Sequence, residues 1–169
     1  CTENQLTELD VRQNVALWRL YCDRNELSSL DVSKNTALEY LDCHLNNLTS
    51  LDVSSFDTSN VIDMGAMFAN CERLTGLDLS GFDTSHVTNM AAMFCICEDL
   101  TSLDLTGFDT SNVADMSNMF RSCTSLTNLN LSSFDASAVT KMDSMFYGCD
   151  NLPDIICPDS KILKEFRNR

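Results

Sequence analysis

Apolar residues recur along this chain with two successive periods. Up to about residue 53 the period is 21, so that Leu9, Leu30 and Leu51 are equivalent. Each unit repeats the form L-x-x-L-D-[V/C]-x-x-N, in which apolar and polar positions alternate. Such alternation is typical of strands. We predict two short strands in each 21-residue rung, joined by turns whose asparagines tolerate left-handed backbone geometry.

From Phe56 the period becomes 26, and each unit begins with F-D-[T/A]-S-x-V. The apolar residues between the Val and Cys of each unit are spaced by 3, 3, 1 and 3, which indicates a helix, and the spacing then shortens to 2 at Leu77 and Leu79, which indicates a strand. The pattern therefore predicts a short helix followed by a strand in every unit. Ser59 and its equivalents stand where they could cap these helices.

The leucines of the predicted strands stay in register across the change of period. The equivalent positions are Leu9, Leu30, Leu51, Leu77, Leu103, Leu129 and Ile155. We therefore predict an α/β solenoid with one continuous parallel sheet. Its C-terminal half should carry short helices on the convex side, because packed helices need ~8–10 Å and paired strands only ~4.8 Å.

The repeats indicate a single domain over residues 1–169. The 21-residue repeats occupy 1–54, the 26-residue repeats occupy 55–154, and 155–169 forms a C-terminal cap. In the cap, Ile162, Leu163 and Phe166 share one face of a predicted helix that would cover the last rung. Because Cys1 already holds a mid-repeat position, we expect further repeats upstream.

Both repeat types have relatives in bacterial surface proteins. From Phe56 to about Leu152 the form F-D-T-S-x-V-x-x-M-x-x-M-F-x-x-C-x-x-L-x-x-L-D-L-S resembles BspA-like leucine-rich repeat proteins. The first half is similar to the 21-residue, cysteine-containing repeats of certain internalins, at L-x-x-L-x-C-x-x-N-x-L-x-x-L-D-V-S-x-N-T. The resemblance implies a right-handed leucine-rich solenoid at the cell surface or secreted, used for adhesion or protein recognition. It carries over no ligand.

Composition narrows the possible partners. The chain has 25 acidic and 11 basic residues and a formal net charge of -14. This charge opposes contacts with phosphate and with anionic lipid, so we expect no nucleic-acid partner. Membrane insertion by this segment is not expected either, since no apolar run approaches the ~18 residues that a membrane span needs.

Most of the nine cysteines fall into two ladders. The ladders are Cys1, Cys22, Cys43 and Cys71, Cys97, Cys123, Cys149, with Cys95 and Cys157 outside them. Cysteines in phase on apolar positions favour buried free thiols, with disulfides or a metal site as alternatives. The C-x-C at Cys95 and Cys97 has no further cysteine or histidine to complete a zinc site. We therefore predict no metal and no cofactor.

An acidic stripe occupies the polar position between the strand leucines. Its members are Asp10, Asp31, Asp52, Asp78 and Asp104. Like charges on neighbouring strands destabilise a sheet, so the repetition needs a reason. Neighbouring hydroxyls, such as those of Thr49 and Thr101, could bond the carboxylates, or the stripe could bind a cation or a basic partner. The pattern leaves these alternatives open.

Candidate binding residues lie where the copies disagree, because the scaffold needs those positions least. They are Trp18, Arg19, Tyr21 and Arg24 in one rung and Tyr40, Asp42 and His44 in the next. Trp, Tyr and Arg are enriched at binding hot spots, although these side chains could equally just cover the sheet.

The chain offers no catalytic residue, since no unrepeated nucleophile or acid–base pair occurs in it. We therefore expect a non-enzymatic recognition or adhesion module of a bacterial cell-surface protein, whose partner is a protein or a glycan. The alternative is a structural spacer or self-associating stalk without a ligand of its own.

Overall fold

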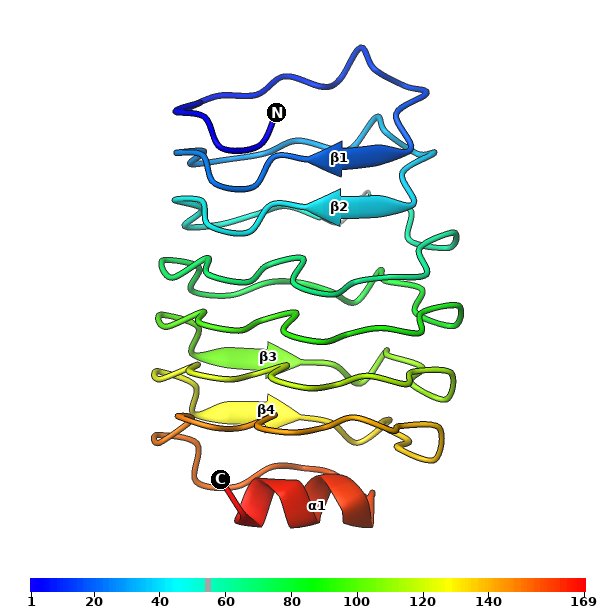
Figure 1. Cartoon of the computed structure of the whole chain (residues 1–169), viewed down its shortest axis with the longest axis vertical. Coiled ribbons are helices and arrows are strands. Elements are labelled where there is room, and N and C mark those ends of the chain that lie inside the picture. The colour runs from blue at the N-terminus through cyan, green and yellow to red at the C-terminus, as the bar shows by residue number, and fades with distance from the viewer. Residues whose placement is uncertain (54–55) are drawn as a thin grey trace.

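The computed structural model describes residues 1–53 and 56–169. The chain runs through a stack of rungs, from the N-terminus at one end to helix α1 (Ser160–Arg167) at the other (Figure 1). Four strands of three residues each are formed, and the central leucine of each is buried. They are β1 (Arg19–Tyr21), β2 (Tyr40–Asp42), β3 (Ser102–Asp104) and β4 (Asn128–Asn130).

The strands fall into two columns on different sides of the rungs. Parallel strands β1 and β2 belong to one column, which we call the first column. Parallel strands β3 and β4 belong to the other, which we call the leucine column because it holds the equivalent leucines that the sequence predicts in one sheet. In Figure 1 the two pairs point in opposite directions, because each rung passes the two columns in turn. The first two 21-residue rungs contribute both a strand and a bridge, since Asp10 pairs with Asp31 in the column opposite β1 and β2. Each of these rungs therefore has one three-residue strand and one isolated bridge in place of the two strands that we predicted.

The expectation of one continuous sheet is wrong. In the leucine column, pairing among the described residues occurs in two separate stretches. One joins Asp10 to Asp31, and the other runs from β3 through β4 to Ile156. Other pairing lies in the first column, where bridges link Asp63, Asn89, Asp115 and Lys141 in succession. The strands of the leucine column are short because a turn follows their last residue, whose side chain accepts from the amide two residues later, at Asp104 in β3 and at Asn130 in β4.

The predicted helices of the 26-residue units are also wrong, because consecutive tight turns satisfy the same apolar spacing. The amides of Ala66 and Phe68 donate to carbonyls of the next rung, at 2.8 and 3.0 Å, while the intervening Met67 amide closes a turn onto Met64. The backbone is left-handed at Ala66 and Asn70, which no α-helix allows. The later units repeat this arrangement, and α1 is the one helix among the described residues.

Without helices on one side, the mismatch in spacing that would curve the C-terminal half is absent. Both sides of a 26-residue rung hydrogen-bond to the neighbouring rung. The convex helical side that we expected is therefore replaced by a second hydrogen-bonded side, and Figure 1 shows the rungs lying one below another.

The core is a set of identical side chains repeated from rung to rung. Phe68, Phe94, Phe120 and Phe146 are fully buried and stack with ring centroids 5.7–5.8 Å apart. The ring of Phe166 from α1 closes this column edge-on, 5.3 Å from Phe146. The terminal helix is thus present where the sequence predicts it, and it buries Ile162 and Phe166, with Leu163 partly buried.

The F-D-T-S box ties neighbouring rungs together. The buried hydroxyl of Thr58 donates to the Asp83 carbonyl at 3.0 Å and accepts from the Asp83 amide at 2.7 Å. Thr84 and Thr110 do the same one and two rungs later. The serine of the box is not a helix cap, since both its amide and its hydroxyl donate to the neighbouring aspartate, as Ser59 does to Asp57.

The last box has Ala136 in place of the threonine, and the cap explains the change. Here α1 packs in place of another 26-residue rung, and the Ala136 amide donates to Asp159 at 3.0 Å. Asp159 also accepts from the amides of Lys161 and Ile162 and so caps α1. Asp159 therefore takes the place of the next rung in binding the last box, and it also caps α1.

Candidate functional site

Four of the predicted binding residues meet on the side of β1 and β2. Leu20 points inward between them, so Arg19 and Tyr21 point outward, and Arg19 pairs in register with Tyr40. The rings of Tyr21 and Tyr40 lie 4.9 Å apart, and the Arg19 guanidinium lies 4.3 Å from the centre of the Trp18 ring. The two rungs therefore present a pair of tyrosine rings and, next to it in sequence, the Arg19–Trp18 pair.

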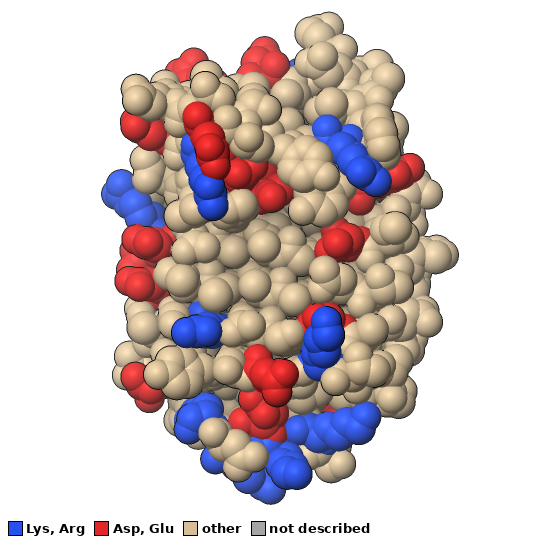
Figure 2. Space-filling model, in the orientation of Figure 1, with Lys and Arg blue, Asp and Glu red and all other residues tan. Residues whose placement is uncertain are grey.

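Ile62 extends this group onto a third rung. It is 60% exposed, compared with 52% for Trp18 and 41% for Tyr21. We call Trp18, Arg19, Tyr21, Tyr40 and Ile62 the aromatic face. In Figure 2, which views the molecule from this side, an uncharged area over β1 and β2 lies between charged side chains, and Lys and Arg gather at the α1 end.

A groove of about 350 Å³ crosses the aromatic face. Its walls are Arg19, Tyr21, Glu39, Tyr40, Ile62 and Asp63. Partial burial raises the pKa of Tyr40 to about 12, and the negative charges of Asp42 and Asp63 act in the same direction. Two carboxylates, those of Glu39 and Asp63, and one guanidinium, that of Arg19, therefore line the groove.

The remaining three predicted residues are engaged elsewhere. Arg24 forms an ion pair with Glu3. Asp42 is buried and accepts hydrogen bonds from the amide and the ring Nδ1 of His44, whose side chain is largely buried too. Asp42 and His44 thus hold a turn of the second rung together, and neither belongs to the exposed aromatic face.

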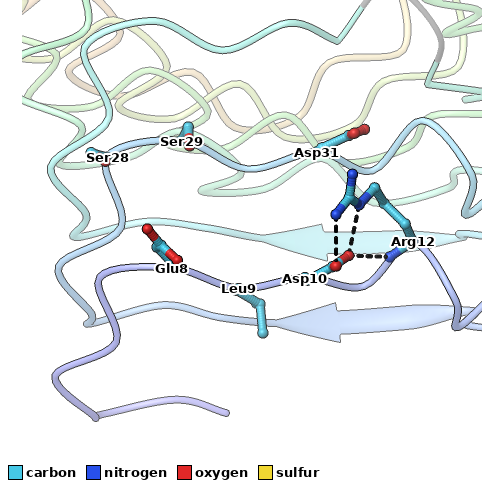
Figure 3. Close-up of a pocket in the computed structure, with 7 residues that line it drawn as sticks. All are labelled: Glu8, Leu9, Asp10, Arg12, Ser28, Ser29 and Asp31. Carbon is cyan, nitrogen blue, oxygen red and sulfur yellow. Dashed lines mark hydrogen bonds and ion pairs between the residues drawn. The ribbon is translucent and has the colours of Figure 1, made fainter.

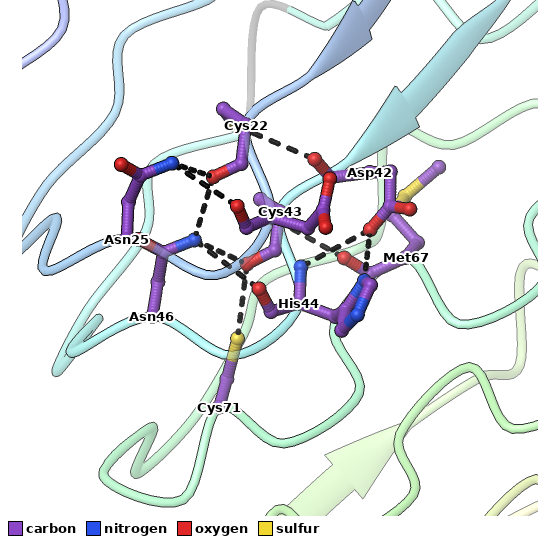
Figure 4. A network of polar contacts seen from close by, with 9 residues as sticks. Cys22, Asn25, Asp42, Cys43, His44, Asn46, Met67 and Cys71 are labelled. Carbon is purple, nitrogen blue, oxygen red and sulfur yellow. Dashed lines mark hydrogen bonds and ion pairs between the residues drawn. The ribbon is translucent and has the colours of Figure 1, made fainter. Parts of the chain in front are cut away.

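Figure 4 shows that the cysteines and asparagines beside this turn bind backbone carbonyls of neighbouring rungs. The Cys22 thiol donates to the Asp42 carbonyl at 3.4 Å and the Cys43 thiol to the Met67 carbonyl at 3.0 Å. The Asn46 amide donates to the carbonyls of Cys22 and Cys43. These cysteines are unpaired, and burial raises the pKa of Cys22 to about 12.

Buried free thiols are confirmed for six of the seven cysteines in the ladders. They are Cys22, Cys43, Cys71, Cys97, Cys123 and Cys149, whereas Cys1 is exposed in the first rung and Cys95 and Cys157, outside the ladders, are half-buried. Every buried thiol donates to a carbonyl of a neighbouring rung. The six buried thiols therefore hold rungs together and are not accessible as nucleophiles.

The acidic stripe lies in the leucine column, and Figure 3 shows its first two members, Asp10 and Asp31. The carboxylate accepts from the backbone amide two residues later in four members, namely Asp10, Asp31, Asp78 and Asp104. Asn130 makes the same bond to the Ser132 amide, and Asp52 is exposed in the same column. Aspartate and asparagine both fit here because the position needs an acceptor that ends the strand.

These bonds also explain how the carboxylates tolerate one another. The side-chain bond from Arg12 lowers the pKa of Asp10 to about 2, and bonds from Ser33 and Ser80 lower the pKa values of Asp31 and Asp78. In these three aspartates the donors lie two residues later, whereas the hydroxyl of Thr101, one of the candidate donors named above, donates to the Thr75 carbonyl. Over residues 1–53 and 56–169, no group of three or more His, Cys, Asp or Glu is placed to hold a metal ion.

Comparison with known families shows to which family the chain belongs. Residues 35–156 match the family described as Mycoplasma protein of unknown function, DUF285. The chain belongs to this family. The match covers all four 26-residue units and about the last third of the 21-residue region, so this DUF285 protein shares its main repeat with the family. No curated protein has a matching sequence.

A solved structure supports the leucine-rich repeat fold. The functional domain of InlJ from Listeria monocytogenes, described as including a cysteine ladder, is 25% identical, with a TM-score of 0.52. The alignment covers 85% of this chain and 33% of the InlJ chain, so the DUF285 protein spans about a third of that domain's length. The in-phase thiols found here match the feature for which that structure is described.

Sequence reasoning missed Ile62 and Asp63 as parts of the groove, although a signal for Ile62 was present. The equivalents of Ile62 in later units are Thr88, Ala114 and Thr140, so the copies disagree there too. In the described residues the structure holds no helix that is long and apolar enough to cross a bilayer.

Proposed function

We propose that this DUF285 protein is a non-enzymatic recognition module of a bacterial cell-surface or secreted protein, and that it binds a partner protein through the aromatic face. The observation that carries the proposal is the exposure of Trp18 and Tyr21 on one rung and of Ile62 two rungs later. The ring of Tyr40 lies on the rung between them and lines the same groove as Tyr21 and Ile62. Large exposed apolar groups in one patch are typical of interaction sites, and Trp and Tyr dominate binding energies.

The scaffold does not need these side chains. Thr88, Ala114 and Thr140 replace Ile62 in later units without changing the rung, and the buried core lies on the inner side of each strand. Exposed aromatic side chains are therefore additions to a fold that is complete without them. This favours recognition over the alternative of a spacer without a ligand.

The repeated polar groups support a non-enzymatic role. Asp57 and Ser59 bond each other, Thr58 bonds the next rung, and the buried thiols bond carbonyls. All are engaged in turns within a rung or in contacts between rungs, which leaves none of them poised as a nucleophile with a base. A location at the bacterial surface, the right-handed solenoid and the BspA-like assignment rest on the repeat resemblance and on the similarity to InlJ.

Binding of labelled protein to host and bacterial cells, measured by flow cytometry, tests the proposal. The triple variant Trp18→Ser, Tyr21→Ser, Ile62→Thr should bind about tenfold more weakly or worse, because hot-spot residues each contribute a large part of an affinity. The matched control Tyr147→Ser, Ile156→Thr removes side chains that are 57% and 59% exposed elsewhere, and it should bind like the parent.

Two treatments identify the partner's class. Protease treatment of the cells should abolish binding, and glycosidase treatment should leave it intact. Binding lost only after glycosidase would replace the protein partner by a glycan. Binding to no cell, or equal binding by the triple variant and the parent, would instead favour the spacer.

A further inference from the structure

The groove on the aromatic face is lined by apolar side chains, by two carboxylates and by Arg19, whose guanidinium lies over the Trp18 ring. Tyr21, Tyr40 and Ile62 provide apolar surface, while Glu39 and Asp63 provide carboxylates. A lysine or arginine side chain has the same two parts, an apolar stem and a cationic head, and it gains most when both find a partner. The groove thus presents the complement of one long basic side chain.

No ion pair among residues 1–53 and 56–169 neutralises these two carboxylates. The Arg19 guanidinium lies over the Trp18 ring, and among the ion pairs of the described residues it forms none with Glu39 or Asp63. Asp63 uses one oxygen, Oδ1, to accept from the Gly65 amide at 2.8 Å and the Asn89 side chain at 2.9 Å. The other carboxylate, Glu39, is exposed.

We propose that the groove binds a lysine or arginine side chain of a protein partner, with its stem against Tyr21 and Ile62 and its cationic head between Glu39 and Asp63. The inference rests on the proposed function and names the group that the aromatic face recognises. A charge of -14 on the chain favours the approach of a basic partner, and charge-assisted hydrogen bonds to two carboxylates would hold the head in place.

A neutral sugar fits the groove less well. Tyr21 and Tyr40 are turned toward each other with ring centroids 4.9 Å apart and planes inclined by 34°, so one face of each ring is directed at the other ring. A sugar ring needs an open aromatic face, whereas a basic side chain needs an apolar edge for its stem and carboxylates for its head. The negative charges around Tyr40 that help to raise its pKa act on any cation in the groove as well.

The test uses short peptides as probes and NMR chemical shifts as the readout. Acetyl-Gly-Arg-Gly-amide and acetyl-Gly-Lys-Gly-amide are titrated into the labelled protein, with the citrulline peptide as the uncharged isostere. The basic peptides should produce saturable shifts at the rings of Tyr21 and Tyr40. The citrulline peptide should bind about tenfold more weakly, because it keeps the shape but loses the charge.

Two double variants separate the groove from the general charge of the chain. Glu39→Gln, Asp63→Asn should weaken the arginine peptide about tenfold, and Asn89 already stands at the position of Asp63 one rung later, so the fold accepts the change. The control Glu98→Gln, Asp99→Asn removes the same two charges from exposed positions outside the groove and should change binding less than about twofold.

Equal weakening by the two double variants, equal binding of the citrulline peptide, or tighter binding of a neutral oligosaccharide would overturn the inference. The outcome is distinguishable from failure of the proposed function. If cells bind the parent and the Glu39→Gln, Asp63→Asn variant equally well, the cationic anchor is wrong and the recognition role stands. If the peptides bind the groove but no cell binds the protein, the recognition role is wrong.

Discussion

The 21-residue and 26-residue regions of this protein build the same two-column cross-section from different side chains. At equivalent distances from their cysteines, the first region has buried Asn46 and the second has buried Leu74. The first region turns its tyrosines outward, at Tyr21 and Tyr40, while the second stacks its phenylalanines inside. The first region therefore combines a polar internal ladder with an aromatic exterior, and the second is a self-contained apolar stack.

The buried thiols of the two regions also donate their hydrogen bonds in opposite directions along the stack of rungs. Cys22 and Cys43 donate to the following rung, whereas Cys97 and Cys123 donate to the preceding rung. Both arrangements satisfy the buried sulfur and a carbonyl. The comparison teaches that the rung tolerates alternative internal bonds, so that exterior positions of the first region can vary without changing the rung.

The largest effect should come from the apolar stack of the second region. Replacing Phe120 by Ala should lower the free energy of unfolding by about 3–5 kcal/mol, because a fully buried ring between Phe94 and Phe146 leaves a cavity. Replacing Tyr21 by Ala should cost about 1 kcal/mol or less, since that ring is 41% exposed. Urea unfolding measures both, and equal losses would contradict the division into interior and exterior aromatic side chains.

The polar ladder of the first region should show the next largest effect. Asn46→Leu, which copies the second region, should cost about 2–3 kcal/mol, because the Leu27 amide and the carbonyls of Cys22 and Cys43 lose a buried partner. Asn47→Leu, at the exposed neighbouring position, should change stability by about 0.5 kcal/mol or less. A neutral Asn46→Leu in the same unfolding assay would show that the two regions use interchangeable turns.

Much of this arrangement could be predicted from the sequence, and the misses have physical causes. The periods identify the buried leucines, the thiol ladders and the amphipathic terminal helix. The turns of the 26-residue units could not be distinguished from helices, because left-handed Ala66 carries no glycine or asparagine signal and the apolar spacing is helical. Trp18, Tyr21 and Tyr40 were found, but the change of period at the third rung hid the contribution of Ile62 and Asp63.

The thiol ladders predict a loss of stability in alkaline solution. The pKa of Cys22 is raised to about 12 in the folded chain, against ~8.5 for an exposed thiol. The contribution of the buried Cys22 thiol to the free energy of unfolding is full below pH ~8.5 and is lost as the pH rises toward 12. In this range the thiol releases its proton in the unfolded chain but retains it in the folded chain.

Each buried thiol should steepen this loss by up to about 1.4 kcal/mol per pH unit. Urea unfolding of the parent and of Cys22→Ala between pH 7 and 10.5 measures the contribution of one thiol. The variant is expected to start less stable and to lose stability more slowly above pH ~8.5. Parallel curves would show that the Cys22 thiolate is tolerated in the folded rung.

The smallest expected effect concerns the acidic stripe. Asp78→Asn keeps the acceptor for the Ser80 amide, as Asn130 does for Ser132, and should change stability by about 0.5 kcal/mol or less. Asp78→Ala removes the acceptor and should cost about 1 kcal/mol. Thermal melts with and without calcium check both variants, and a calcium-dependent rise in Tm that Asp78→Asn reduces would mean that the stripe binds the ion.

Site-specific photocrosslinking on intact cells tests the central claim most directly, namely that recognition belongs to the exterior of the first region. The crosslinking residue p-benzoylphenylalanine is placed at Tyr21 in one protein and at Tyr147 in another, since both side chains are exposed and aromatic but lie in different regions. The account predicts a discrete protein adduct from position 21 and none from position 147. An adduct formed only from position 147 would contradict it.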